Sequence, residues 1–495
     1  MSTRPDVLVG FMGAGKTTVG MRLAELRGVQ FADADAELQR RTSRSIPDLF
    51  SEGEEAFREL EESVIADLLT VGGPGVVALG GGALTRPGTR RLLAEQARVL
   101  WLDAPAEILW ARVEQDGGAS TRPLAVNLHR FSELRRQREG LYQTAADAIV
   151  DAAAPADLVA TACRDAGIVR TGALDRIAEI TGDRRALLVV DAPVADRVPQ
   201  LGLHLVLPGG EQVKDIATVE QLWRAFADAE LERRDVIVAV GGGAVTDVTG
   251  FAAATFRRGL DWISCPTTLV GQVDAGSGGK TGIDLAAKND VGAFHPPIAV
   301  LSDPALLATL PPREWSAGFV EGLKSALLQG DALWALVRRW PTGRGTDDQR
   351  LELIRRAAAL KGRVVAADPK EAGERAILNL GHTIGHGIEY AAGGRYLHGE
   401  AIAIGLVAAL SLSVEHAGLD IVVADEVMGL LSREGLSTVA EGVDPDRVLA
   451  AMRSDKKRSA GRVRFVLLEA PGRPRWGVEL DDAVVSRAVS AACGG

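Results

Sequence analysis

Residues 7–17 read VLVGFMGAGKT and decide the fold of the first part of the chain. Three apolar residues, Val7–Val9, are followed by Gly10–Thr17, which fits the pattern GxxxxGK[ST], and then by the amphipathic stretch Thr17–Leu26. A strand, a glycine-rich turn and a helix in this order form a loop whose backbone N–H groups cradle phosphates, and the helix N-terminus adds its positive end. The segment therefore predicts a P-loop that binds a nucleoside triphosphate.

The same alternation of short apolar runs and amphipathic stretches continues along the chain. Val236–Val240, for example, precedes the amphipathic stretch Asp247–Thr255. Strands that alternate with helices predict parallel sheets covered on both faces. From Glu314 onward, long periodic segments predict helices at 348–367, 400–417 and 424–434. The expected fold class is α/β: a P-loop NTPase-type parallel-sheet domain, a Rossmann-like α/β domain, and an all-helical domain.

The length of 495 residues is too great for one ordinary domain. A helical stretch at 155–166 closes the first unit, so we expect a first domain at 1–166, a linker at 167–173 and a second domain at 174–495. The second domain is expected to divide into an α/β part, 174–312, and a helical part, 313–495.

The bulk composition limits the class of partner. A net charge of −10 argues against nucleic acid or an anionic membrane as the main partner, so small anionic ligands need local basic clusters. The three cysteines, Cys163, Cys265 and Cys493, form no CxxC pair, which is typical of a reducing compartment. The P-loop starts too early for a preceding signal peptide, and no apolar run reaches the ~18 residues that span a bilayer. We expect a cytoplasmic protein.

Acidic and basic residues that follow the P-loop indicate its second substrate. Asp33 and Asp35 share one face if the segment is extended, so one can hold Mg²⁺ through water while the other meets a substrate hydroxyl. Three arginines, Arg58, Arg122 and Arg138, accompany the turn Gly80-Gly81-Gly82. Arginines spaced in this way suit an enzyme that binds a carboxylate and neutralises a transferring phosphoryl group.

Over 1–166 these motifs resemble shikimate kinase. The resemblance implies Mg²⁺ at Thr17 and Asp33, and a lid over ATP that carries Arg122. The residues implied to bind ATP are Gly13, Ala14, Gly15, Lys16, Thr17, Thr18 and Arg122. Those implied to bind shikimate are Asp35, Arg58, Gly81 and Arg138. A generic nucleotide or gluconate-type kinase is the alternative, and it is expected to lack the combined FxDxD, FR and GGG set.

Histidines gather in the second half. The chain has only seven, yet His382, His386 and His398 fall within 17 residues. His382 and His386 lie on one face if their segment is helical. The spacing alone leaves open whether both are ligands of one metal, with an acid elsewhere as the third, or whether they are two satisfied helix histidines.

A second glycine turn and a set of basic residues surround this cluster in sequence. Val238–Thr246 (VAVGGGAVT) nearly repeats Val77–Thr85 (VALGGGALT), but the flanks share nothing, which favours two independent strand-to-turn solutions over a duplication. Asp247 is expected at the start of the next helix, and GxGxxG is absent. Basic residues recur in glycine- or asparagine-rich turns, which suits a substrate with a carboxylate and a phosphate. They are Lys280, Lys288, Lys324, Lys361, Arg375 and Lys456.

From about 187 to 476 the chain resembles 3-dehydroquinate synthase. The segments that carry the resemblance are GEQVK (210–214), GGGAVTDVTGF (241–251), PTT (266–268), QVDAGSGGKT (272–281), KNDVGAF (288–294), LPPRE (310–314), LNLGHTIGH (378–386), LHGEA (397–401) and DKK (455–457). The family usually has glycine at the position of Thr246, and its loop before Lys288 is usually one residue longer.

This resemblance implies NAD⁺, and Zn²⁺ (or Co²⁺) held by Glu321, His382 and His398, with His386 as a proton-handling or substrate contact. The residues implied to bind NAD are Glu211, Lys214, Gly242, Gly243, Asp247, Thr267, Thr268, Asp274, Lys280, Lys288 and Asn289. Those implied to bind the substrate, the seven-carbon keto-sugar acid phosphate DAHP, are Arg258, Asp274, Lys280, Asn289, Lys324, Lys361, Arg375, Asn379, His386 and Lys456. Arg258 is implied to act across the interface of a homodimer formed by this domain.

The two resemblances together predict a bifunctional enzyme of aromatic amino acid biosynthesis. Eight residues are expected to act in catalysis: Lys16, Asp35, Arg122, Lys280, Lys324, Lys361, Asn379 and His386. The alternatives are a kinase fused to another sugar-phosphate cyclase, to a polyol dehydrogenase, or to an inactive synthase-like domain.

Overall fold

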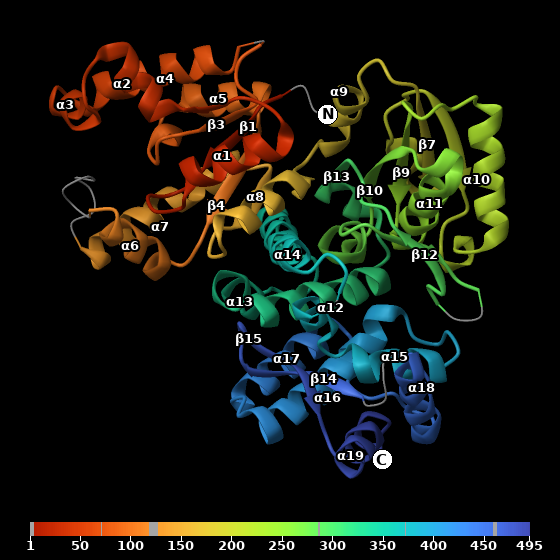
Figure 1. The fold of residues 1–495 in the computed structure, drawn as a ribbon. Coiled ribbons are helices and arrows are strands. Elements are labelled where there is room, and N and C mark those ends of the chain that lie inside the picture. Colours follow the sequence, from red (N-terminus) through yellow and green to blue (C-terminus); the bar gives the residue numbers. More distant parts are fainter. Residues whose placement is uncertain (1–3, 71, 118–126, 286–287, 372, 459–462) are drawn as a thin grey trace. The chain divides into compact units, whose positions relative to one another are not determined.

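The computed structural model describes residues 4–70, 72–117, 127–285, 288–371, 373–458 and 463–495, apart from the side chains of 454–458. The chain forms two compact units (Figure 1). Unit 1 contains Met1–Val169 and Arg176–Gly182, and unit 2 contains Arg170–Asp175 and Asp183–Gly495.

Unit 1 is built on a parallel five-stranded sheet with the order β2-β3-β1-β4-β5. Its strands are β1 (Asp6–Val9), β2 (Phe31–Asp33), β3 (Val76–Ala78), β4 (Arg98–Asp103) and β5 (Ala148–Asp151), and a short β6 (Ile168–Val169) follows. The run Val7–Val9 forms the central strand and is buried, because neighbouring strands and helices cover it on every side.

Helices α1 and α8 pack together in unit 1, and α4, α5 and α7 form a second group. The helices are α1 (Lys16–Arg27), α2 (Ala34–Thr42), α3 (Ile46–Ser51), α4 (Glu54–Leu68), α5 (Pro87–Gln96), α6 (Ala106–Gln115), α7 (Leu128–Ala145), α8 (Ala156–Asp165) and α9 (Ile177–Thr181), with the 3₁₀ turn η1 (Ala83–Thr85). A second 3₁₀ turn, η3 (Ala173–Arg176), belongs to unit 2 except for its last residue. Helix α1 begins directly after Gly15, whose φ of 79° is open to glycine at little cost. The phosphate loop therefore leads straight into a helix N-terminus.

Unit 2 begins with a second parallel sheet, in which its own strands run in the order β13-β10-β9-β7-β8. The strands are β7 (Ala186–Asp191), β8 (Leu203–Leu207), β9 (Val236–Gly241), β10 (Asp261–Pro266) and β13 (Ala299–Ser302). Helices α10 (Ile216–Asp228) and α11 (Gly243–Thr255) pack against each other, and a core that includes Phe226 and Trp262 lies between them and the sheet. An antiparallel hairpin, β11 (Lys280–Ile283) and β12 (Val291–Phe294), packs against α11.

Short turns complete this α/β part. They are η4 (Ala192–Arg197), η5 (Glu211–Val213), η6 (Phe256–Arg258), the π-helical turn η7 (Gly271–Ala275) and η8 (Pro304–Thr309).

The rest of unit 2 is mainly helical, as the periodicity predicts. The helices are α12 (Pro312–Gln329), α13 (Asp331–Arg338), α14 (Asp347–Ala367), α15 (His382–Ala391), α16 (His398–Ala417), α17 (Ile421–Arg433), α18 (Pro445–Arg458) and α19 (Asp482–Ala492), with the 3₁₀ turn η9 (Glu374–Asn379). The expectation of an all-helical part is wrong in one respect, because β14 (Arg464–Ala470) and β15 (Arg473–Glu479) form an antiparallel hairpin. Gly472, at φ 84°, provides the turn between them.

Helix α16 is long and apolar enough to cross a membrane by composition, but 61% of its apolar window is buried inside the fold. It packs against α12, α15, α19 and β14, and Ile404 and Leu412 belong to a core that these elements share. Its apolarity is therefore that of a core helix.

Candidate active sites

The P-loop of unit 1 forms a cradle of backbone groups. Gly13 and Gly15 have φ of 78° and 79°, and a Cβ atom at Gly13 would overlap the carbonyl oxygen of Leu109. Lys16 Nζ donates to the carbonyl oxygens of Gly10 at 2.9 Å and Phe11 at 3.1 Å, so the cation lies over the loop. Inward-facing N–H groups with a lysine above them form an anion site.

Thr17 and Asp33, the expected Mg²⁺ contacts, are in direct contact. Thr17 Oγ1 donates to Asp33 Oδ2 at 2.6 Å. The expectation that Asp33 and Asp35 share the face of one strand is wrong. Asp33 ends β2 and caps α2, accepting hydrogen bonds from the backbone N–H groups of Asp35 and Ala36, so Asp35 lies in the first helical turn. An aspartate at this position satisfies helix donors that otherwise have no partner.

A cavity of about 530 Å³ lies beside the P-loop. All the P-loop residues expected to bind ATP line it, namely Gly13, Ala14, Gly15, Lys16, Thr17 and Thr18. The far side includes Arg112, which sequence analysis missed and which donates to the carbonyl oxygen of Ala152 at 2.8 Å. Arg122 lies outside the described residues.

The arginines expected to bind shikimate lie against the Gly80–Gly82 turn. Arg58 Nη1 is 2.6 Å from Glu61 Oε2, and Arg138 Nη1 donates to the carbonyl oxygen of Gly81 at 3.2 Å. A Cβ atom at Gly80 would lie 2.8 Å from Asp35 Oδ1, so this carboxylate is at the same turn. Burial raises the pKa of Glu61, and Arg58 only partly offsets it. The structure thus brings Asp35, Arg58, Gly81 and Arg138 together.

In unit 2, four of the residues expected to bind NAD directly follow the carboxyl ends of β9 and β10, where parallel sheets bind nucleotides: Gly242, Gly243, Thr267 and Thr268. A Cβ atom at Gly242 would be 3.1 Å from Thr268 Cγ2, and Thr267 N donates to the carbonyl oxygen of Gly241. Lys214 Nζ bridges Asp247 Oδ2 at 2.8 Å and Asn289 Oδ1 at 2.5 Å. Asp247 is the fifth residue of α11 and not its first, because the strand ends at Gly241, Gly242 is the N-cap and the helix begins at Gly243.

A second group of expected residues forms a buried ion cluster. Asp274 Oδ1 is 2.6 Å from Lys361 Nζ, and its Oδ2 is 3.8 Å from Lys324 Nζ. Burial alone would raise the pKa of Asp274, but Lys361 and Lys324 hold it well below its usual value. Arg375 reaches the same place, since a Cβ atom at Gly278 would lie 3.2 Å from Arg375 Nη2 and 3.3 Å from Lys361 Cε. Lys324 Nζ also lies 2.6 Å from Glu321 Oε2, so the three cations Lys324, Lys361 and Arg375 face two carboxylates, Asp274 and Glu321. The remaining positive charge suits an anionic ligand.

Lys280 and Asn379 are joined by a residue that sequence analysis missed. Glu371 Oε2 forms an ion pair with Lys280 Nζ, and its Oε1 accepts from Asn379 Nδ2 at 3.3 Å. Burial would raise the pKa of Glu371, but its hydrogen bond and charge interaction with Lys280 lower it. Glu371 also has a φ of 58°, uncommon for a residue with a side chain and worth attention beside a binding site.

The expected metal ligands converge. The fully buried Glu321 places Oε1 3.6 Å from His382 Nε2 and 3.3 Å from His398 Nε2. Nitrogen atoms of His382, His386 and His398 lie within 4.8 Å of one another. No donor among the described residues satisfies Glu321 Oε1 with good geometry, so a cation between these groups fits the site. Burial and the Lys324 cation lower the pKa of His382 to about 3, which leaves its imidazole neutral, the form that binds metals.

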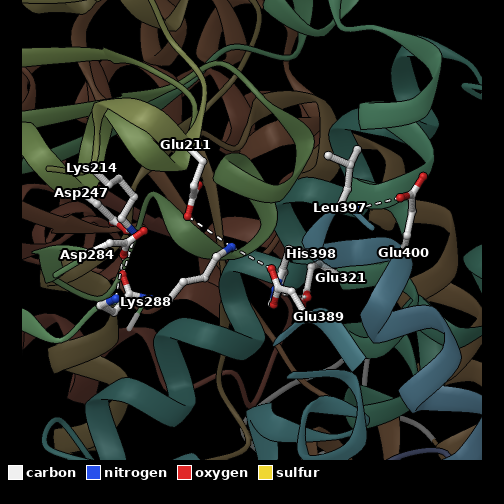
Figure 2. Close-up of polar contacts among 11 residues, drawn as sticks. Glu211, Lys214, Asp247, Asp284, Lys288, Glu321, Glu389, Leu397, His398 and Glu400 are labelled. Carbon is white, nitrogen blue, oxygen red and sulfur yellow. Dashed lines mark hydrogen bonds and ion pairs between the residues drawn. The ribbon is translucent and has the colours of Figure 1, made fainter. Parts of the chain in front are cut away.

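A chain of charged groups connects the residues expected to bind NAD with the expected metal ligands (Figure 2). Lys288 Nζ lies 3.4 Å from Glu211 Oε1 and 2.8 Å from Glu389 Oε1. Glu389 Oε2 lies 3.3 Å from His398 Nδ1. Glu389 was also missed from the sequence, although its position three residues after His386 on a helix could have indicated it.

Two expected substrate residues are not placed at the site. Arg258 is exposed on η6 and has a φ of 68°. It takes part in none of the site contacts described in the preceding paragraphs. Lys456 lies on α18, but its side chain is outside the described part of the chain.

Fold and sites together define a P-loop kinase unit joined to an α/β-plus-helical unit with a histidine-carboxylate centre. Comparisons with known proteins identify both. Residues 12–166 match the shikimate kinase family, residues 204–317 match the 3-dehydroquinate synthase N-terminal family, and residues 318–458 match the 3-dehydroquinate synthase C-terminal family. The 3-dehydroquinate synthase of Synechococcus sp. (strain CC9605) is 42% identical over 318 residues, which are 61% of this chain and 86% of that protein.

Solved structures of related enzymes have the same fold as unit 2. ValA, a 2-epi-5-epi-valiolone synthase from Streptomyces hygroscopicus subsp. jinggangensis 5008 with NAD⁺ and Zn²⁺ bound, is 28% identical with a TM-score of 0.58, covering 62% of this chain and 89% of that chain. A 2-deoxy-scyllo-inosose synthase complexed with carbaglucose-6-phosphate, NAD⁺ and Co²⁺ is 26% identical with a TM-score of 0.58, covering 65% of this chain and 95% of that one.

The chain belongs to the 3-dehydroquinate synthase family and carries a shikimate kinase domain at 12–166. It has both activities, which are steps of the shikimate pathway.

Proposed function

We propose that the two activities reside in two separate sites, one in each unit. In unit 1, MgATP is bound by the P-loop residues that line the cavity, with Thr17 and Asp33 at Mg²⁺ and Lys16 at the β- and γ-phosphates. Asp35 accepts the proton of the shikimate 3-hydroxyl, whose oxygen attacks the γ-phosphorus while the bond to ADP breaks. Arg58, Arg138 and the Gly81 backbone position shikimate, and Arg122 covers ATP.

The observation that carries the kinase assignment is the convergence of two arginines and one carboxylate on the Gly80–Gly82 turn. A bidentate arginine is suited to a carboxylate such as that of shikimate.

In unit 2, we expect NAD⁺ to bind at Gly242 and Gly243 and zinc to bind to Glu321, His382 and His398. When bound, NAD⁺ supplies reversible hydride transfer and Zn²⁺ supplies polarisation of the substrate hydroxyl. The remaining proposed NAD contacts are Glu211, Lys214, Asp247, Thr267, Thr268, Asp274, Lys280, Lys288 and Asn289. The observation that carries this assignment is that Glu321 Oε1 faces the Nε2 atoms of both His382 and His398.

The buried ion cluster around Asp274, together with Lys280, binds the phosphate and carboxylate of DAHP. Lys280, Lys324, Lys361 and Arg375 supply the charge, and Lys456 is proposed to join them. Asn379 and His386 contact the substrate, and His386 takes or gives a proton there while Asn289 and Asp274 orient neighbouring groups. Fixed charges of this kind orient the substrate and replace its hydration shell.

Another sugar-phosphate cyclase activity is disfavoured by sequence identity. The curated 3-dehydroquinate synthases are 39–42% identical over most of their length, whereas the two cyclases with other products are 28% and 26% identical.

Two matched pairs of variants test the division into two sites. We expect Lys16→Ala to lower shikimate-dependent ADP release by about 100-fold or more and to leave phosphate release from DAHP intact. His382→Ala is expected to do the reverse. Arg22→Ala, exposed on the same helix as Lys16, and His416→Ala, at the far end of α16, are the controls. Loss of both activities in either variant would argue against separate sites.

Metal removal and a histidine variant distinguish two possible sets of metal ligands: Glu321, His382 and His398, or a pair formed by His382 and His386. We expect dialysis against a zinc chelator, followed by added Mg²⁺, to abolish DAHP turnover and spare the kinase. His386→Ala should still bind one equivalent of zinc. Loss of that zinc would instead favour His382 and His386 as joint ligands.

We further propose a cytoplasmic homodimer formed through the synthase domain, with domain limits 1–166 and 174–495 around a linker at 167–173. The exposed position of Arg258 supports a role at the partner's site. Mixing Arg258→Ala with Lys324→Ala chains tests it, because only a shared site restores activity in mixed dimers. Mixtures that remain inactive despite exchange of chains would exclude the shared site.

A further inference from the structure

Glu389 is placed to hold a zinc ligand. It lies on α15 seven residues after His382 and three after His386, so all three side chains share one helix face. Its side chain is only 11% exposed, and Oε2 lies 3.3 Å from His398 Nδ1. A buried carboxylate at this position requires ionic or hydrogen-bonding partners, and the ring of His398 is one of them.

The two ring nitrogens of His398 face different groups. Nδ1 faces Glu389, while Nε2 faces Glu321 Oε1 at 3.3 Å. His382 is arranged in the same way, with Nδ1 3.1 Å from the carbonyl oxygen of Leu380 and Nε2 toward Glu321. When Nδ1–H donates to an acceptor, the lone pair on Nε2 is left for a metal. The acceptor is a fixed backbone group for His382 but a side chain for His398.

The second oxygen of Glu389 connects this pair to the cofactor side of the site. Glu389 Oε1 accepts from Lys288 Nζ at 2.8 Å (Figure 2). Lys288 is followed by Asn289, whose Oδ1 accepts from Lys214 Nζ. Lys288 therefore holds one oxygen of the carboxylate whose other oxygen faces His398 Nδ1.

We propose that Glu389 is a positioning residue that fixes the tautomer and orientation of His398 and, through Lys288, couples the metal site to the cofactor side. The inference rests on the proposed zinc ligands Glu321, His382 and His398. It predicts that metal affinity depends on two residues that do not touch the metal, and that Lys288 acts on it only through Glu389.

Zinc affinity of the full chain, measured by competition with a chromophoric chelator, tests the first part. We expect Glu389→Ala to raise the zinc Kd by about 10–100-fold, the usual effect of removing a carboxylate behind a histidine ligand. Glu389→Gln keeps an acceptor oxygen and should recover part of the loss. The visible spectrum of the Co²⁺-loaded protein should change in Glu389→Ala, because His398 is no longer held.

Glu400→Gln is the matched control. Like Glu389, Glu400 is a carboxylate close to His398, but it lies on α16, two residues after that histidine. It binds Arg313 and the backbone N–H of Leu397 and does not contact the His398 ring. A general disturbance of this helix end would raise the zinc Kd in Glu400→Gln as well, whereas a specific role predicts a change of less than twofold. Kinase activity of each variant reports whether unit 1 remains intact.

A double-mutant cycle tests the coupling. We expect Lys288→Met to raise the zinc Kd about fivefold in the native background, at the low end of coupling between sites. It should cause no further change in the Glu389→Ala background, because the path is already broken. Equal effects in both backgrounds would overturn the coupling.

His382→Ala distinguishes the two kinds of failure. If it leaves zinc binding intact, the proposed ligand set is wrong and the inference falls with it. If it abolishes zinc binding while Glu389→Ala leaves the Kd within twofold of native, only the role of Glu389 is wrong.

Discussion

Two nearly identical stretches, VALGGGALT at 77–85 and VAVGGGAVT at 238–246, have different structures. Both begin within a buried strand, β3 or β9. Both end in a threonine that donates to the carbonyl oxygen of the third glycine, Thr85 to Gly82 at 2.7 Å and Thr246 to Gly243 at 3.0 Å. In unit 1 the chain then makes the short turn η1, and a helix starts only at Pro87. In unit 2 helix α11 runs without a break from Gly243 to Thr255.

The flanking residues explain the difference. Arg86 precedes a proline, which disfavours helical backbone, and it has φ −78° and ψ 126°. The second stretch is followed by Asp247-Val248, which has no such restriction. A glycine triplet thus permits a close approach to a ligand, while the residues around it decide what forms there: an arginine site in unit 1 and a helix N-terminus in unit 2.

The largest contrast between the two stretches is the space beside the third glycine, Gly82 in unit 1 and Gly243 in unit 2. A Cβ atom at Gly82 would overlap the guanidinium of Arg58, 2.6 Å from its Cζ, whereas one at Gly243 would lie 3.3 Å from Ala275 Cβ. We expect Gly82→Ala to lower kcat/KM for shikimate by about 100-fold, because displacing a positioning group by about 1 Å costs that much. Steady-state kinase assays measure it.

Gly243→Ala is the equivalent change in unit 2. It replaces glycine by alanine in the first turn of a helix, and we expect synthase activity to fall by less than about tenfold, since helices tolerate alanine well. Similar losses in the two variants would show that the two turns do not differ as described. Because Arg58 has a flexible side chain, Gly82→Ala should change the melting temperature little.

A buried carboxyl lies beneath each turn and gives the next contrast. Glu61 is paired with Arg58, but Asp191 has no salt bridge among the described residues, and burial raises its pKa more than its hydrogen bond with Gly242 lowers it. A carboxyl with a raised pKa gives full stability below its ordinary pKa, and this stability is lost as pH rises through the folded-state pKa. We expect Asp191→Asn to be more stable than native at pH 7.5 and equal to it near pH 4.

Calorimetry of the full chain at several pH values measures this difference. Glu61→Gln provides the comparison: burial raises the pKa of Glu61 too, but its carboxylate is paired with Arg58. Among the described residues, the glutamine leaves the buried guanidinium of Arg58 with only the longer contact to Glu54, at 3.4 Å, and is expected to destabilise the chain at pH 7.5. If the stability difference between Asp191→Asn and the native chain grew toward low pH, the pKa of Asp191 would be lowered in the folded chain and not raised.

The turns also illustrate what can be predicted from sequence. The P-loop could be read directly, because a backbone cradle is built by consecutive residues, and the long helices α14, α16 and α17 followed from their periodicity. The hairpin β14–β15 did not, since its apolar run Phe465–Leu468 is too short to distinguish a strand from a buried helix by period.

Side chains that are far apart in the sequence were assigned to a common site only where they belong to a recognisable family motif. Glu371 and Glu389 have no motif of their own, and they matter because folding brings Glu371 to Lys280, 91 positions away, and Glu389 to Lys288, 101 positions away. Asp35 was misplaced for a local reason, since the pattern DxD does not distinguish an extended pair from a helix cap followed by a first-turn residue.

The two threonines provide a smaller contrast, because they form the same hydrogen bond at different burial. Thr246 is buried, whereas Thr85 is exposed. We expect Thr246→Ala to destabilise the chain by about 1 kcal/mol through the lost hydrogen bond and packing, and Thr85→Ala by less than about 0.5 kcal/mol. Chemical denaturation measures both.

The same threonine variant bears on the cofactor. The Thr246 hydroxyl is bonded to Gly243 within the helix, so we expect the Kd for NAD⁺ to change by less than about threefold in Thr246→Ala. A tenfold change would show that this hydroxyl or its methyl group contributes to the cofactor site.

The smallest effect is expected for Pro87→Ala, which asks what keeps the first turn from continuing as a helix. Without the proline, helical backbone becomes accessible to Arg86, yet this residue is also held by ion pairs with Glu55 and Glu62. If these pairs suffice, Pro87→Ala keeps kinase activity and loses only about 0.5 kcal/mol, because the unfolded chain gains freedom. If the proline alone maintains the break, residues 83–96 become one helix, the Gly81 carbonyl moves away from Arg138, and the KM for shikimate rises. Kinetics and denaturation of Pro87→Ala beside Arg86→Ala separate the two causes, since only the second variant removes the ion pairs and keeps the proline.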